Sequence, residues 1–135
     1  MPFDEKLLPH EVDARVAKYL LNKITSSRDR QIPFELTFIE VKNLMQTERC
    51  YYTGITLTMT QPGQAQKLTD FTIDRIDNNL GYVTGNVVAC CHAANSFKGM
   101  IEGMTDTLSL EQKASILMVT VMKIRAQQAQ KELSF

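Results

Sequence analysis

Apolar residues recur at helical spacing in two stretches near the start of the chain. From Pro9 to about Ser26 they stand three to four positions apart, with charged and amide residues between them, and this spacing predicts an amphipathic helix. Thr37 followed by Glu40 has the spacing of a capping box, which predicts the start of a second, short helix that ends just before Cys50. We therefore expect residues 1–49 to form a helical N-terminal part.

A different pattern follows, in which apolar and hydroxyl residues alternate. Ile55–Thr60 alternates in this way, and Phe71–Ile76 resumes the alternation after a segment that contains Pro and Gly. These features predict two antiparallel strands joined by a loop. Val87–Lys98 has the pattern of a helix that Gly99 ends. The sequence therefore predicts a strand, strand, helix unit over residues 50–100.

The last third of the chain predicts one long helix. Ser109 and Gln112 have capping-box spacing, so the helix should begin there and run to about Lys131. Its apolar residues cover more than one stripe: Leu110, Ala114, Ile116, Leu117, Met118, Val119, Val121, Met122 and Ile124. Such a wide apolar surface indicates deep burial or a subunit contact, and we expect this helix to contribute to a homodimer.

Length and composition place these elements in one globular domain. The 135 residues are 44% hydrophobic and 22% charged, with fifteen basic and fifteen acidic side chains, so overall charge predicts no attraction to nucleic acid or to a membrane and any basic surface must be local. Three cysteines, two of them adjacent, do not make a disulfide framework, and no stretch approaches the roughly 18 apolar residues of a membrane span. We expect a single α+β domain over 1–135, with the C-terminal helix in 101–135, and a cytoplasmic location.

The central third carries several motifs in a fixed order. Thr72-Ile73-Asp74-Arg75-Ile76-Asp77-Asn78-Asn79-Leu80-Gly81 is followed by Thr84-Gly85-Asn86 and then by Cys91-His92-Ala93-Ala94-Asn95-Ser96-Phe97-Lys98-Gly99, and Cys50-Tyr51-Tyr52-Thr53-Gly54 lies upstream. Together, over about residues 28–100, these motifs resemble the HNH (His-Me finger) endonucleases, particularly phage-type members. The resemblance implies a ββα-metal finger and a metal-dependent endonuclease or nickase that hydrolyses phosphodiester bonds of DNA.

The resemblance also implies a set of site residues. Asp74 and Asn95 would be the metal ligands, Asn86 would brace the loop between strand and helix, and Lys98 lies where family members contact the phosphate backbone. A carboxylate and an amide oxygen are hard ligands that suit Mg²⁺ or Mn²⁺. A cation held in this way can polarise a phosphodiester and stabilise the leaving oxygen.

One departure from the family pattern concerns the catalytic histidine. Arg75 stands in its place, and a guanidinium does not accept a proton at neutral pH, although it can clamp a phosphate through two hydrogen bonds. Arg75 is therefore a candidate for phosphate binding, and the general base must come from His92, Asp77 or Tyr82. In a related group with the motif Asp-Arg-Gly-His, the histidine is the base, and Asp77 occupies that position here.

A second departure concerns the structural zinc of many family members, which four cysteines hold. Here the two Cys-x-x-Cys positions contain Cys50 with Thr53 and Cys91 with Ala94. Because two of the four ligands are missing, we do not expect a structural zinc.

Other interpretations of the same residues stay open. On turn chemistry alone, the aspartates and asparagines of 74–79 would only cap backbone groups, Arg75 would form a surface ion pair, and His92 or Asn95 would have no role. At the level of function, the alternative is a catalytically inactive HNH-like module that binds nucleic acid or a partner protein. A third interpretation is a structural phage protein that keeps the finger only as a folding core.

Overall fold

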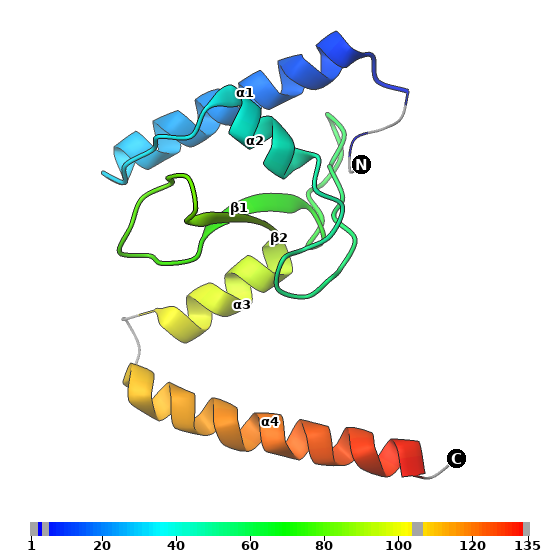
Figure 1. Cartoon of the computed structure of the whole chain (residues 1–135), viewed down its shortest axis with the longest axis vertical. Helices are drawn as coiled ribbons and strands as arrows, with labels where there is room; N and C mark the ends of the chain where they lie inside the picture. Colours follow the sequence, from blue (N-terminus) through cyan, green and yellow to red (C-terminus); the bar gives the residue numbers. More distant parts are fainter. Residues whose placement is uncertain (1–2, 4–5, 104–106, 134–135) are drawn as a thin grey trace. The chain divides into compact units, whose positions relative to one another are not determined.

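The computed structural model describes residues 3, 6–103 and 107–133, and Figure 1 shows the whole chain. The chain divides into two compact units, residues 1–96 and 97–135, and the boundary lies within a helix. Among the described residues the order of elements is helix, helix, strand, strand, helix, helix, and the strands form one antiparallel pair. The expected α+β class, with N-terminal helices and a long C-terminal helix, is confirmed.

The first unit begins with two helices whose ends follow the local sequence signals. Helix α1 (Pro9–Asp29) starts with Pro at its first position, and the Glu11 carboxylate accepts a hydrogen bond from the backbone N–H of Leu8 at 2.9 Å. It runs three residues past the predicted end. Helix α2 (Phe38–Met45) is capped by the Thr37 hydroxyl, which accepts a hydrogen bond from the Glu40 N–H at 3.2 Å. Both helices were predicted, and α2 ends earlier than expected, at Met45.

The sheet pairs different segments from those that the alternation predicted. Strand β1 (Phe71–Arg75) lies antiparallel to β2 (Val87–Cys91). The prediction that Ile55–Thr60 forms the first strand is wrong, because this segment makes only isolated bridges. Its hydroxyl groups bind side chains instead: Thr58 donates a hydrogen bond to the Asp70 carboxylate at 2.6 Å.

The prediction of a helix from Val87 is also wrong at its start. A short apolar run does not distinguish a buried strand from a helix, and pairing with β1 makes residues 87–91 a strand. Helix α3 (His92–Glu102) starts directly after β2, where the His92 N–H donates a hydrogen bond to the Asp70 carbonyl at 3.0 Å. Gly99 does not end α3, since one glycine costs only about 1 kcal/mol in a helix.

The two ends of the sheet adjoin different elements, α3 at the helix end and the loop 76–86 at the loop end. At the helix end, Phe71 pairs with Cys91 next to the start of α3, and at the loop end, Arg75 pairs with Val87 across the loop 76–86. Because side chains alternate along a strand, Asp74 and Arg75 point to opposite faces. Tyr19 of α1 packs on one face, with its ring 5.4 Å from that of Phe71.

The second unit contains the remainder of α3 and helix α4 (Leu110–Leu133). The Ser109 hydroxyl and the Gln112 side chain exchange hydrogen bonds with each other's backbone N–H at 3.1 and 2.9 Å, which confirms the predicted capping box. Lys113 is buried and donates to the Gly103 carbonyl at 2.7 Å. Large apolar side chains of α4 are exposed: Leu110, Ile116, Met118, Val119, Val121, Met122, Ile124 and Leu133. Among the described residues, no helix has the length and apolar character needed to cross a membrane.

Candidate functional site

The Asp74 carboxylate lies at the loop end of the sheet and is buried. Its exposed fraction is 7%, and the Tyr52 hydroxyl donates a hydrogen bond to its Oδ2 at 2.7 Å. Tyr52 itself is 40% exposed and belongs to the turn that follows Cys50. A buried carboxylate is thus bound to a phenol that solvent can reach.

Asn86 ties together the loop 76–86 that follows Asp74. Its amide nitrogen donates hydrogen bonds to the carbonyls of Asp77 and Gly81, both at 3.0 Å, and its amide oxygen accepts one from the Asp77 N–H at 2.9 Å. Gly81 allows a close approach, because a Cβ there would stand 2.5 Å from the Pro33 carbonyl oxygen. The loop that Asn86 braces joins two strands, rather than a strand and a helix as the sequence predicted.

Arg75 is turned toward the same loop. Its Nη1 donates hydrogen bonds to the carbonyls of Asn78 and Leu80 at 3.0 and 3.1 Å, and its guanidinium carbon lies 5.3 Å from the centre of the Tyr82 ring. The side chain therefore helps to hold the loop in shape.

The three candidate bases lie in different surroundings. His92 lies at the helix end beside Asp70, and its Nε2 is 2.6 Å from the Gln66 amide nitrogen. Burial lowers the pKa of His92, and Lys23 adds to this effect while Asp70 opposes it. Because β1 advances about 3.3 Å per residue, Asp70, which lies beside His92, is about 13 Å from Asp74 along the chain.

Tyr82 and Asp77 both lie near the loop end. Tyr82 is buried and in contact with Arg75, so it belongs to the face opposite Asp74. The Asp77 carboxylate is exposed and accepts a hydrogen bond from the Asn79 N–H at 2.9 Å. Of the three candidate bases, Asp77 is the one whose side chain is exposed, and it is also the closest in sequence to Asp74.

The remaining predicted site residues lie on α3. Asn95 is half-buried and belongs to the first unit, whereas Lys98 belongs to the second unit and forms an ion pair with Glu102 at 3.1 Å. Within the described part of the chain, no group of three or more His, Cys, Asp and Glu side chains could hold a metal ion. A cation at Asp74 would need amide and water oxygens as its further ligands, which suits Mg²⁺.

The Cys50 turn stands where many HNH family members carry the first cysteine pair of their structural zinc site, and it packs against β2. The Tyr51 N–H donates a hydrogen bond to the Ala89 carbonyl at 2.9 Å. Burial raises the pKa of the Cys50 thiol, but hydrogen bonds from the Thr53 hydroxyl and from the N–H groups of Cys91, Thr53 and Tyr52 outweigh this and lower the pKa to about 7. The sulfur is thus held by the protein's own donors.

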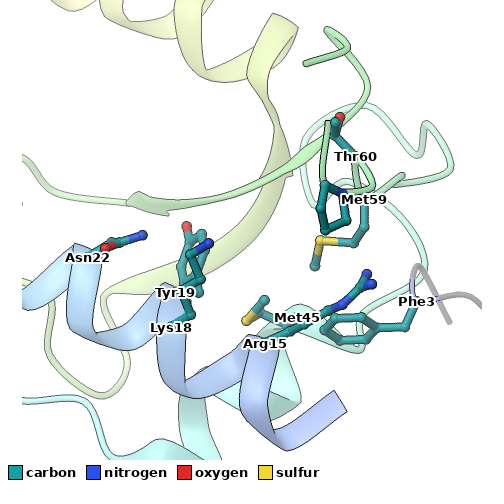
Figure 2. Close-up of a pocket in the computed structure, with 9 residues that line it drawn as sticks. Phe3, Arg15, Lys18, Tyr19, Asn22, Met45, Met59 and Thr60 are labelled. Atoms are coloured by element: carbon teal, nitrogen blue, oxygen red, sulfur yellow. The ribbon is translucent and has the colours of Figure 1, made fainter. Parts of the chain in front are cut away.

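A pocket of about 270 Å³ opens beside α1, away from the predicted site residues. Figure 2 shows Arg15, Lys18 and Asn22 extending from α1, with Met45 and Met59 nearby. The lining is completed by Phe3, Tyr19, Thr60 and Pro62. None of the residues that the HNH resemblance implies lines this pocket.

Comparisons with known proteins give one relative of undetermined activity. No protein-family model matches the chain, and no solved structure matches it. The chain is similar to a protein of Enterobacteria phage T4 described as "Uncharacterized 29.0 kDa protein in dda-modA intergenic region", with 29% identity over 84 residues. The match covers 62% of this chain and 32% of that protein, so this chain spans about a third of its relative's length.

Proposed function

We propose that the protein is a metal-dependent endonuclease or nickase that hydrolyses phosphodiester bonds of DNA. The observation that carries the proposal is the order of elements, β1, braced loop, β2 and α3, with the carboxylate of Asp74 buried in β1. The HNH resemblance implies this order of elements, and the proposal requires α3 to bring Asn95 to the loop end, where Asp74 lies. The T4 relative supports a phage origin for the fold and says nothing of its activity.

Asp74 and Asn95 are the proposed ligands of Mg²⁺ or Mn²⁺. When bound, such a cation would polarise the phosphodiester and stabilise the departing oxygen. The Tyr52 hydroxyl, which donates to Asp74 at 2.7 Å, would orient the carboxylate. Asp77 is the proposed general base because it is exposed and follows Asp74 closely in the sequence.

The test is nicking of a supercoiled plasmid with Mg²⁺ or Mn²⁺. Asp74→Ala and Asn95→Ala should abolish nicking, whereas Asp29→Asn, which removes an exposed carboxylate from the end of α1, should not change it. Arg75→His restores the family residue and should raise the rate, since a positioned general base contributes roughly 10²–10⁴-fold. The proposal fails if neither the wild type nor Arg75→His cleaves DNA, or if Asp74→Ala cleaves as fast as the wild type.

A specific observation also favours the second candidate, a catalytically inactive module that binds nucleic acid or a partner protein. Arg75, in the position of the family's base, donates two hydrogen bonds to loop carbonyls, which is a structural use of that position. The exposed apolar side chains of α4 support a protein partner, and a homodimer through this helix remains our proposal. Sedimentation equilibrium at tens of micromolar tests it, and a monomer would contradict it.

A further inference from the structure

Three cationic side chains from distant parts of the first unit surround the buried ring of Tyr82. The Lys23 ammonium lies 5.1 Å from the ring centre and the Arg75 guanidinium carbon lies 5.3 Å from it. The Arg30 Nη2 donates a hydrogen bond to the Tyr82 hydroxyl at 3.0 Å. Lys23 lies on α1 and Arg30 directly follows its last residue, whereas Arg75 ends β1. The tertiary structure therefore brings Arg75 to two cations that are far from it in the sequence.

Among the residues that the structure describes, neither Lys23 nor Arg30 forms an ion pair with a carboxylate. Burial raises the pKa of Tyr82, but the charges of Lys23, Arg30 and Arg75 and the Arg30 hydrogen bond lower it overall. Like charges held near one ring repel one another, so an anion bound there would relieve the repulsion.

We propose that Lys23, Arg30 and Arg75 form a binding site for a phosphate group of a nucleic-acid backbone. Guanidinium groups match phosphate oxygens in geometry, and the Tyr82 hydroxyl, which accepts its bond from Arg30, still has a proton to donate. Lys23 and Arg75 are half-buried and Arg30 is exposed, so a phosphate on the surface could reach them. A local basic site of this kind is compatible with a chain of zero net charge.

The proposed phosphate site is distinct from the proposed nuclease centre at Asp74, although Arg75 of the phosphate site is adjacent to Asp74 in the sequence. Asp74 and Arg75 are adjacent at the loop end of the sheet and point to opposite faces. A strand that crosses the loop end could place one phosphate at Asp74 and another at the cluster. Binding at the cluster does not depend on a metal ion, so it can be tested when no cleavage occurs.

The experiment measures binding of a fluorescein-labelled DNA oligonucleotide by anisotropy, in EDTA and over a series of salt concentrations. The double variant Lys23→Gln/Arg30→Gln should bind roughly tenfold more weakly. It should also reduce the slope of log K against log salt by about 1, as expected for loss of one phosphate contact. Arg28→Gln is the matched control, because it removes one exposed charge from the opposite side of α1, and it should leave the slope unchanged.

Two further measurements distinguish the loss of a phosphate contact from misfolding of a variant and from binding of free phosphate. Arg30→Lys keeps the charge and should retain most of the salt slope, while circular dichroism establishes that each variant is folded. Inorganic phosphate at millimolar concentration should compete poorly with the oligonucleotide if the backbone is the ligand, and effective competition would identify free phosphate as the ligand and overturn the backbone assignment. The proposal is also overturned if the folded double variant binds with the wild-type affinity and slope, or if the wild type binds no DNA in EDTA. Loss of nicking alone, with binding kept, would contradict only the proposed nuclease activity.

Discussion

Asp70 and Asp74 are two buried aspartates, four residues apart, and they differ in what surrounds each carboxylate. Asp70, at the helix end, is enclosed by donors of the chain itself: the hydroxyls of Thr58 and Thr60 and the Lys67 N–H. Asp74, at the loop end, accepts a hydrogen bond from Tyr52, whose side chain is 40% exposed. The two carboxylates are similarly buried, so burial does not distinguish their roles: the contacts of Asp70 stabilise the fold, and a functional role for Asp74 is our proposal.

The largest expected effect on stability follows from removing Asp70. Asp70→Ala would leave the hydroxyls of Thr58 and Thr60 and the Lys67 N–H without their acceptor, and it should lower the free energy of unfolding by about 3 kcal/mol. Asp74→Asn, which keeps an acceptor for Tyr52, should cost less than about 1 kcal/mol. Urea denaturation followed by circular dichroism measures both values. Equal losses of unfolding free energy from the two substitutions would show that the two aspartates do not differ in their contribution to stability.

A smaller effect on the free energy of unfolding, also at the helix end of the sheet, depends on pH. The Cys50 thiol has a pKa of about 7 in the folded protein, whereas an unfolded thiol has one of about 8.5. The thiolate therefore stabilises the fold fully above the unfolded pKa, and this contribution, about 2 kcal/mol, is lost as the pH falls through 7. Wild-type stability should rise between these pH values more than that of Cys50→Ser.

Thr53→Val is the matched control for this pH effect. It keeps the thiol and removes the hydroxyl that donates to it, so its pH dependence should lie between those of the wild type and Cys50→Ser. Denaturant titrations at several pH values measure all three proteins. Parallel pH profiles for the wild type and Cys50→Ser would show that the thiolate does not contribute.

Local sequence signals predicted the helices better than the sheet. The boxes at Thr37 and Ser109 are complete within a few residues, so their chemistry does not depend on the rest of the chain. Residues 87–91 are an apolar run whose state is decided by pairing with β1. Ile55–Thr60 has strand-like alternation, but its hydroxyls bind Asp70 instead of supporting a ladder. The sequence alone does not identify Asp70 as the partner of these hydroxyl groups.

The residues of the candidate site could likewise be predicted only where the signal is local in the sequence. Asp74, Asn86 and Asn95 could be named from motifs that lie close together in the sequence. Tyr52 and the pair Lys23 and Arg30 were missed, because their contacts with Asp74 and Tyr82 join residues 22 to 59 positions apart. The adjacent Tyr51 and Tyr52 after Cys50 are the available sequence signal for Tyr52, and a tyrosine pair is equally compatible with packing. Lys23 and Arg30 stand among polar residues, and the sequence pattern does not distinguish them from cations of an ordinary solvated helix face.

The most direct test of the assignment at Asp74 is the affinity of the protein for Mn²⁺, measured from the free-ion signal in electron paramagnetic resonance. We predict one Mn²⁺ per chain in the wild type and at least about tenfold weaker binding in Asp74→Asn and Asn95→Ala, with no change in Asp29→Asn. The account would be contradicted if the wild type bound no Mn²⁺, or if Asp74→Asn bound it as tightly as the wild type.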